Sequence, residues 1–341
     1  MTEKIVVAVV GAGGWGKNHV RTFATLPGAE LRYVCDRSEA VRAQVTAHFP
    51  DVRPVAELEQ VLADTAVRAI VIAADAPSHE ALARAALEAG RDVFVEKPLT
   101  LAASTSAALC EIAEARSAIL MVGHLLLYHP AIEKLRALID AGELGDVLYL
   151  TSQRTNLGVV RRDENAWWSL APHDIAVANY LLGASPVSVS ASGGTFLQTE
   201  RGIEDVVFAT LKYPGGKLAH VHVSWLDPHK TRRLTVVGSR KMAVFDDTSP
   251  DQKLTLFDKG VELPPPALTY AEGVRLRTGD IVAPALRMTE PLKRECEDFL
   301  EAVRSRKRPL ADGKSGWEVV RVLEAGARSL AEAGRRVDIG L

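Results

Sequence analysis

The chain has 341 residues, of which 47% are hydrophobic and 25% charged. These values are close to the average for soluble globular proteins, which excludes a mainly disordered chain. Its 41 Lys and Arg residues nearly balance its 43 Asp and Glu residues, so no global basic field exists to attract nucleic acid. Apolar runs stay well short of the roughly 20 residues that span a bilayer, and no signal peptide is recognisable. Three widely separated cysteines fit buried thiols in a reducing cytoplasm.

The first 124 residues alternate short apolar runs with helical stretches. Runs that are apolar throughout predict strands buried on both faces, and we place them at 4–10, 29–36, 68–74, 92–96 and 117–123. Helices are expected between several of them, at 38–49, 78–89 and 102–116. This alternation predicts right-handed crossovers and a Rossmann-type, doubly wound parallel sheet in a domain of residues 1–124.

The pattern changes in residues 125–341. A helix at 130–141 and a strand at 147–154 precede a short helix at 173–182, which we expect to begin after Pro172. Six β-rich segments with tight turns then lie between 187 and about 257, and they predict a largely antiparallel, open-faced sheet. Residues 260–288 read as a long surface excursion, and helices at 291–304 and 315–333 close an α+β domain.

A glycine-rich turn follows the first predicted strand and opens a helix. It reads Gly11-Ala12-Gly13-Gly14-Trp15-Gly16 and fits the pattern GxGxxG. The first glycine permits the tight turn, the second lets a pyrophosphate approach the backbone, and the third allows close packing of helix on strand.

An acidic residue ends the second strand at the distance expected for a dinucleotide site. Asp36 lies 20 residues after Gly16, where a carboxylate would accept hydrogen bonds from the ribose hydroxyls of NAD. Asp36 would repel a 2′-phosphate, which favours NAD over NADP, although the guanidinium of Arg37 keeps NADP open. The alternative is a glycine turn used only for packing, with Asp36 as a helix cap.

The fourth strand ends in Glu96-Lys97-Pro98. Ligands of a doubly wound sheet bind beyond the carboxyl ends of its strands, so Lys97 is expected where a nicotinamide would lie. A partly desolvated lysine near a cationic ring should have a lowered pKa, which suits proton exchange with an alcohol. The alternative is a surface lysine in a strand–helix loop.

With these motifs in this order, the whole chain resembles the Gfo/Idh/MocA oxidoreductase family. The stretch Ala76-Pro77-Ser78-His79 belongs to the same pattern. The resemblance implies hydride transfer between NAD(P) and a sugar, inositol or related polyol, with Lys97 as the catalytic lysine. It also implies a cofactor site that includes Glu96 near the nicotinamide ribose and the residues Ala74, Pro77 and His79. Members often have a cis bond before the proline that follows the lysine.

The second half of the active site departs from the family pattern. Members usually carry Asp-x-x-x-His at the start of a helix, whereas this chain has Ser169 four residues before His173. His173 is expected to carry a proton or anchor the substrate. Without that aspartate, proton relay must depend on Lys97 and His173, or on water. The neighbouring Trp168 and Asp174 suggest a polar site with an aromatic wall; the alternative is that His173 only caps or packs.

Four stretches further resemble the WlbA-like dehydrogenases of this family. They read GHLLLYHPAIEKLRALIDAGELGDV, RTNLG, NAWWSLAPHDI and HVSWLDPHKTRRLTVVGSRKM. This resemblance implies oxidation at C3 of UDP-linked N-acetylglucosamine or its uronate. Two alternatives remain: another enzyme on this scaffold, such as an inositol or free-sugar dehydrogenase or a dTDP-keto-sugar ketoreductase, and a non-catalytic NAD-sensing protein.

A nucleotide-sugar needs polar groups for its phosphates and its sugar. The candidates before the histidine helix are Arg154, Asn156, Arg161, Arg162 and Asn165, with a solvated loop as the alternative. His124 and Tyr128 follow the last strand of the cofactor domain and could touch substrate or simply pack a hinge, and Lys17 could reach substrate or pyrophosphate.

Two further expectations concern metals and partners. His220 and His222 share one strand face, but without a suitably spaced third ligand we expect no metal site. An open sheet with one uncovered face should self-associate, as a dimer or, by family habit, a tetramer.

Overall fold

The structure, a computed structural model, describes residues 3–262 and 275–340. It contains two compact units, one of Met1–Tyr128 with Thr289–Arg321 and the other of His129–Met288 with Val322–Leu341. The first unit therefore includes the later segment Thr289–Arg321, which the predicted domain of residues 1–124 does not contain. Helix α9 (Pro291–Ser305) belongs there because its buried face includes Phe299, whose ring lies edge-on to Phe94 with 5.5 Å between centroids.

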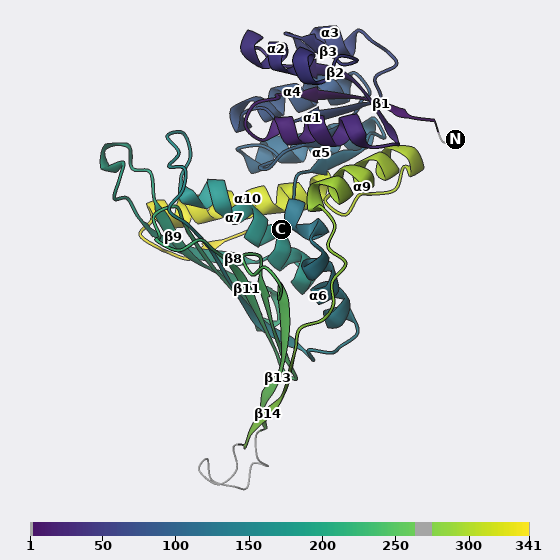
Figure 1. Cartoon of the computed structure of the whole chain (residues 1–341). Coiled ribbons are helices and arrows are strands. Elements are labelled where there is room, and N and C mark those ends of the chain that lie inside the picture. The colour runs from purple at the N-terminus through teal and green to yellow at the C-terminus, as the bar shows by residue number, and fades with distance from the viewer. Residues whose placement is uncertain (1–2, 263–274, 341) are drawn as a thin grey trace. The chain divides into compact units, whose positions relative to one another are not determined.

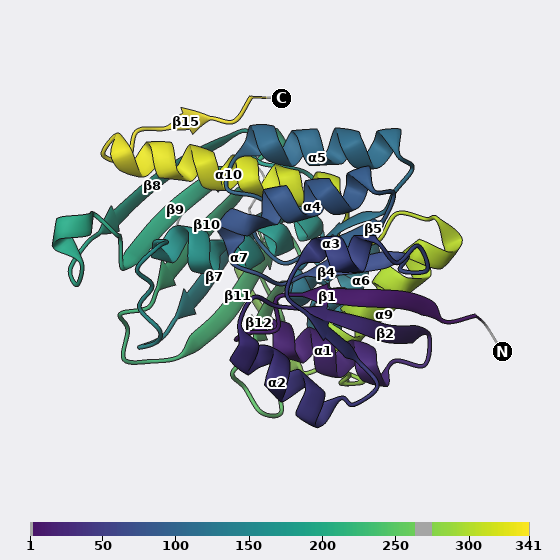
Figure 2. The same ribbon diagram turned by 90° about the horizontal axis from the view of Figure 1, so that it is seen from above.

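The first unit is built on a six-stranded sheet in the order β3-β2-β1-β4-β5-β6, and every neighbouring pair is parallel. Figure 2 shows α1 and α2 on one face of this sheet and α4 and α5 on the other. The strand order confirms the predicted Rossmann architecture. Its elements are β1 (Ile5–Val10), α1 (Gly16–Thr25), β2 (Ala29–Cys35), α2 (Glu39–His48), β3 (Arg53–Val55), α3 (Leu58–Leu62), β4 (Ala69–Ile72), α4 (His79–Glu88), β5 (Asp92–Val95), α5 (Ala103–Ala115), β6 (Leu120–Val122) and the start of α10 (Gly313–Ala331).

The central strands show why the apolar runs form a two-sided core. All residues of β4 and β5 are buried, and β1 has one half-buried position in six. β-Branched residues dominate these runs, and they pack well on a pleated surface that helices cover on both sides. Polar side chains consequently appear just beyond the strand ends, where the chain leaves this core.

The second unit is built on a nine-stranded sheet in the order β14-β13-β12-β11-β7-β10-β9-β8-β15. Every pair is antiparallel except β7 with β10, which confirms the largely antiparallel prediction. The elements are α6 (Pro130–Asp140), β7 (Val147–Thr155), α7 (Ala166–Leu182), β8 (Ser188–Gly194), β9 (Val206–Lys212), β10 (Leu218–Ser224), β11 (Thr231–Gly238), β12 (Met242–Asp246), β13 (Leu254–Glu262), β14 (Arg275–Val282) and β15 (Val337–Asp338).

One face of the second sheet is covered and the other is open. Helices α6 and α7 contact β7, β10 and β12 from the same side, as Figure 1 shows. On the opposite side, within the described residues, no helix covers the sheet. This open side carries Tyr149, Phe208 and Leu218, each about two-fifths exposed.

Two predicted elements were wrong in extent. Helix α7 begins at Ala166 and contains Pro172, whereas the sequence suggested a start after that proline. The Asn165 side chain caps the helix by accepting from the Trp168 backbone N–H, and dense burial compensates for the N–H that Pro172 lacks. The expected surface excursion at 260–288 includes strand β14, which pairs with β13; its residues 263–274 lie outside the described part.

Candidate active site

The glycine turn shows which of its glycines the fold requires and which are open to a ligand. Gly11 has φ +84°, and a Cβ there would lie 2.7 Å from the Ala74 backbone; a Cβ on Gly16 would lie 2.0 Å from the Gly11 carbonyl oxygen. By contrast, a Cβ on Gly13 or Gly14 would meet nothing within 4 Å. The turn is therefore closed by Gly11 and Gly16 and leaves bare backbone at Gly13, as pyrophosphate binding demands.

Asp36 faces this turn. Its Oδ2 accepts a hydrogen bond from the Ala12 N–H at 2.8 Å, and its Oδ1 accepts from the Ser38 N–H at 2.9 Å. An ionised carboxylate offers about four acceptor positions, so ribose hydroxyls can still bind. Ser38, rather than Asp36, caps α2. These residues fit NAD, while the Arg37 guanidinium is exposed and 3.9 Å from Asp75.

The turn after β5 is fixed around a buried carboxylate. The Lys97–Pro98 peptide bond is cis, as the family resemblance implied. Glu96 Oε1 accepts from the Trp15 indole N–H at 2.7 Å and lies 2.7 Å from His19 Nε2, and Glu96 Oε2 accepts from the Lys97 backbone N–H at 3.2 Å. Burial opposes the ionisation of Glu96, but these hydrogen bonds and the nearby charge of Lys97 outweigh it and lower the pKa of Glu96.

His79 links two turns of the same edge. Its Nδ1 lies 2.7 Å from the Pro98 carbonyl oxygen and its Nε2 lies 3.1 Å from that of Ala74. Burial is the largest influence on the pKa of His79 and lowers it. A neutral ring donates its single N–H to one of these two carbonyls, and the ring lies between the Lys97–Pro98 turn and the end of β4. Its neighbour Pro77 is exposed.

The residues after β6 differ in their surroundings. His124 is 1% exposed, and burial lowers its pKa to about 4. Among the residues that the structure describes, neither of its ring nitrogens has a hydrogen-bond partner. Tyr128 donates its hydroxyl to Asp298 at 2.7 Å and accepts from the Ala311 N–H at 3.3 Å. These contacts favour the packing alternative for Tyr128. Lys17 is exposed on the first turn of α1.

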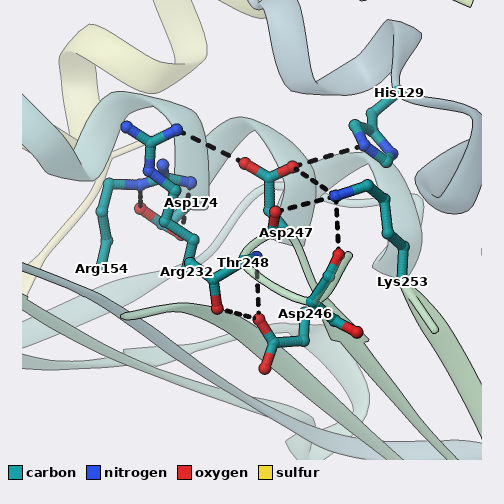
Figure 3. Close-up of polar contacts among 9 residues, drawn as sticks. His129, Arg154, Asp174, Arg232, Asp246, Asp247, Thr248 and Lys253 are labelled. Carbon is teal, nitrogen blue, oxygen red and sulfur yellow. Dashed lines mark hydrogen bonds and ion pairs between the residues drawn. The ribbon is translucent and has the colours of Figure 1, made fainter. Parts of the chain in front are cut away.

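In the second unit, Arg154 and Asp174 form a buried ion pair. Arg154 Nε donates to Asp174 Oδ2 at 2.7 Å and its Nη2 donates to Oδ1 at 3.3 Å (Figure 3). The Ser152 hydroxyl also donates to Asp174. The pair joins β7 to α7 one residue after His173. Arg154 is thus neutralised by the protein itself, which weighs against its expected role as an anion ligand.

The remaining substrate candidates have mixed environments. Asn165 caps α7 and donates to Glu204 at 2.8 Å. Arg161 is exposed and 3.6 Å from Glu164. Other candidates are half-buried or exposed without a contact that decides their role: Asn156, Arg162 and Trp168.

His173 is half-buried on α7, and Ser169 lies one helical turn before it. The helix thus places the side chains of Ser169 and His173 on the same face, at the spacing for which the family resemblance implied an aspartate instead of Ser169. Lys97 and His173 belong to different units, so their cooperation remains a prediction.

Two polar clusters escaped the sequence analysis. The sequence predicted a helix over His19 but no role for its side chain. Its position on the apolar face of that helix, beside Val20 and Phe23, could have marked it as a buried polar residue. His129, the N-cap of α6, lies 3.5 Å from Asp247, which is also close to Arg232 and Lys253 (Figure 3). No local pattern in the sequence pairs residues so far apart.

Two absences hold for the described residues. Across 3–262 and 275–340, no helix is long and apolar enough to cross a membrane. In the same ranges, no three His, Cys, Asp or Glu side chains are grouped to hold a metal ion.

Comparisons with known proteins agree with the architecture. Residues 5–124 match the Gfo/Idh/MocA oxidoreductase family with an NAD-binding Rossmann fold, and residues 132–244 match the family's C-terminal domain. The uncharacterized oxidoreductase YdgJ of Escherichia coli is 30% identical over 80% of this chain and 82% of its own length.

Two characterised types of enzyme are also similar. A UDP-N-acetylglucosamine 3-dehydrogenase from Acidithiobacillus ferrooxidans is 29% identical over 92% of this chain and 93% of its own length. A solved structure of that enzyme, GnnA, superposes with a TM-score of 0.82 at 27% identity over 97% of this chain and 99% of that one. A scyllo-inositol 2-dehydrogenase from Bacillus subtilis is 27% identical over 91% of this chain and 89% of its own length. The chain belongs to the Gfo/Idh/MocA family, as an oxidoreductase with an NAD-binding Rossmann domain that acts on CH–OH groups.

Proposed function

We propose that this enzyme transfers hydride between C3 of a nucleotide-linked sugar, UDP-N-acetylglucosamine or its uronate, and NAD. The observation that carries the proposal is the likeness, over nearly the full length of both chains, to the UDP-N-acetylglucosamine 3-dehydrogenase GnnA. Fold alone does not fix a substrate, so the proposal also depends on the residues of the site.

The cofactor-binding residues follow from the geometry of the first unit. Backbone N–H groups of the turn from Gly11 to Gly16 would hold the pyrophosphate, and Asp36 would accept from the adenosine ribose hydroxyls. NAD⁺, when bound, supplies the hydride acceptor. The protein positions the reacting carbon and handles the proton.

Lys97 acts as the base. In the oxidative direction its neutral amine takes the hydroxyl proton while the hydride leaves the same carbon, which gives a ketone, a protonated lysine and the reduced cofactor. His173 assists as a proton carrier, and Ser169 takes the place of the missing aspartate. A separate substrate unit implies hinge closure during turnover.

An inositol or free-sugar dehydrogenase is the second candidate. One observation favours it: Arg154, a predicted ligand for a diphosphate or carboxylate, is already paired with Asp174. A neutral polyol needs no free guanidinium at that point, and an inositol dehydrogenase is among the similar proteins.

Two experiments test these proposals. The Lys97→Met variant should lose about 10²-fold or more in kcat, as expected for removal of a general base; unaffected NADH production would refute the chemistry. A thermal-shift panel with NAD⁺ present should show stabilisation by UDP-N-acetylglucosamine or its uronate. A response to myo-inositol alone would favour the second candidate.

The same proposal includes the assembly and the compartment. The open face of the second sheet would join copies of the chain as a dimer or tetramer. Three free cysteines fit a reducing cytoplasm.

A further inference from the structure

His19 and Glu96 form a buried pair behind the Lys97 turn. His19 is fully buried, and its Nε2 lies 2.7 Å from Glu96 Oε1. Since Glu96 is ionised, Nε2 carries the proton and donates it. The other nitrogen, Nδ1, is 3.9 Å from the Cys296 sulfur on α9. The Phe94 ring, edge-on at 5.1 Å between centroids, fixes the plane of the imidazole.

Glu96 connects the glycine turn and the start of α1 to its own turn after β5. Its Oε1 accepts from Trp15 of the glycine turn as well as from His19 of α1, and its Oε2 accepts from the backbone N–H of Lys97. Gly123 completes the fit, because a Cβ at that position would lie 2.7 Å from Glu96 Oε2. A single carboxylate therefore connects the dinucleotide turn to the backbone of the lysine.

Four other titratable groups interact electrostatically with Glu96, and burial disfavours the charged form of each. Burial raises the pKa of Glu295 and of Cys296 well above their usual values, and burial lowers the pKa of His79 and of His124. The Lys97 charge lowers the pKa of Glu96, and by reciprocity the Glu96 charge favours the protonated form of the Lys97 amine.

We propose that His19 and Glu96 are a positioning pair for Lys97: His19 keeps the Glu96 carboxylate ionised and oriented, and that carboxylate fixes the lysine backbone and sets the protonation of its amine. The proposal depends on the proposed role of Lys97 as the base. Neither residue needs to touch the substrate. Their effect is expected in the pH profile and in kcat rather than in folding.

The test compares Glu96→Gln, His19→Leu, His19→Gln and the control Val20→Ala, a buried neighbour of His19 on the same helix. Activity is followed with UDP-N-acetylglucosamine and myo-inositol across pH, NADH affinity by fluorescence titration, and stability by thermal melting. NADH affinity and melting also show whether each variant folds.

Glu96→Gln should move the acidic limb of kcat/KM about one unit lower, because the amine loses a stabilising anion. Its kcat should fall by up to about 10²-fold through misplacement of the amine. His19→Leu should shift the limb in the same direction, and His19→Gln, which retains a donor, should restore much of the wild-type profile. Val20→Ala should lower the melting temperature without moving the profile.

The proposed positioning role would be overturned if the pH profile of kcat/KM were unshifted in both Glu96→Gln and His19→Leu and activity fell only as far as stability falls. That outcome is separable from failure of the proposed function. If Lys97→Met abolishes turnover while the pair variants keep the wild-type profile, only the positioning role fails. If Lys97→Met is fully active, the lysine chemistry itself fails.

Discussion

Arg154 and Asp174 meet through two hydrogen bonds, of 2.7 and 3.3 Å, in the interior of the second unit. We had predicted from the sequence that both residues line the substrate site. In the structure the charge and hydrogen-bonding groups of each are paired with those of the other. Because the pair joins β7 to α7, it holds the helix that carries His173. The pair is therefore part of the packing of α7 on β7.

Breaking this pair should destabilise the protein. Removing one partner leaves a buried charge uncompensated, at a cost of about 3–5 kcal/mol in unfolding free energy. Arg154→Met and Asp174→Asn should each show this loss in urea unfolding, and the double variant should lose less than the sum. If the losses of unfolding free energy in the two single variants added up in the double variant, Arg154 and Asp174 would not be directly paired.

The glycine turn offers a matched comparison of folding with binding. Gly16→Ala should lower the melting temperature, because its Cβ would lie 2.0 Å from the Gly11 carbonyl oxygen. Gly13→Ala should leave the melting temperature unchanged, since its Cβ meets no protein atom within 4 Å, and should weaken NADH binding by obstructing the pyrophosphate. Normal NADH affinity in Gly13→Ala would show that the dinucleotide takes another path.

Asp247 should contribute pH-dependent stability. The hydrogen bond from His129, together with Arg232 and Lys253, outweighs burial and lowers the pKa of Asp247 from 3.8 to about 2. A depressed pKa in the folded state stabilises the fold above the unfolded value and loses that effect as pH falls from about 4 toward 2. The contribution is on the order of 2 kcal/mol at neutral pH.

Asp247→Asn should therefore be less stable than wild type in urea at pH 6, and the difference should shrink as the pH approaches 2.5. Asp246→Asn is the matched control, because the Asp246 carboxylate accepts hydrogen bonds from the backbone N–H and the hydroxyl of Thr248 in the adjoining turn. A difference independent of pH would show that Asp247 acts through packing alone.

The open sheet face should carry the contacts between subunits. Leu218 pairs across strands with Tyr149, and both are about two-fifths exposed. Leu218→Glu would place a charge in a buried interface and should reduce the oligomer measured by light scattering. Leu157→Glu, at a loop position that is 72% exposed, should leave the assembly unchanged. A monomeric wild-type protein would refute self-association.

Much of the fold could be read from local patterns. Uniformly apolar runs predicted the buried parallel strands, and the glycine turn with Asp36 predicted a dinucleotide site whose shape the structure explains. These features depend on neighbours in the sequence, because strand burial, turn geometry and helix starts are set within a few residues. Pro172 led to a wrong prediction for the start of α7. The helix continues through this proline because the burial of its side chains outweighs the local cost of the proline.

Only the tertiary structure decided which polar residues face one another. His19 meets Glu96 across 77 residues, and Arg154 meets Asp174 across 20 through the packing of a helix on a strand. The sequence identified the residue types that chemistry requires, but partner choice depends on how distant segments fold together. The electrostatic state of Lys97 and the availability of Arg154 both follow from such partners, and no local pattern encodes them.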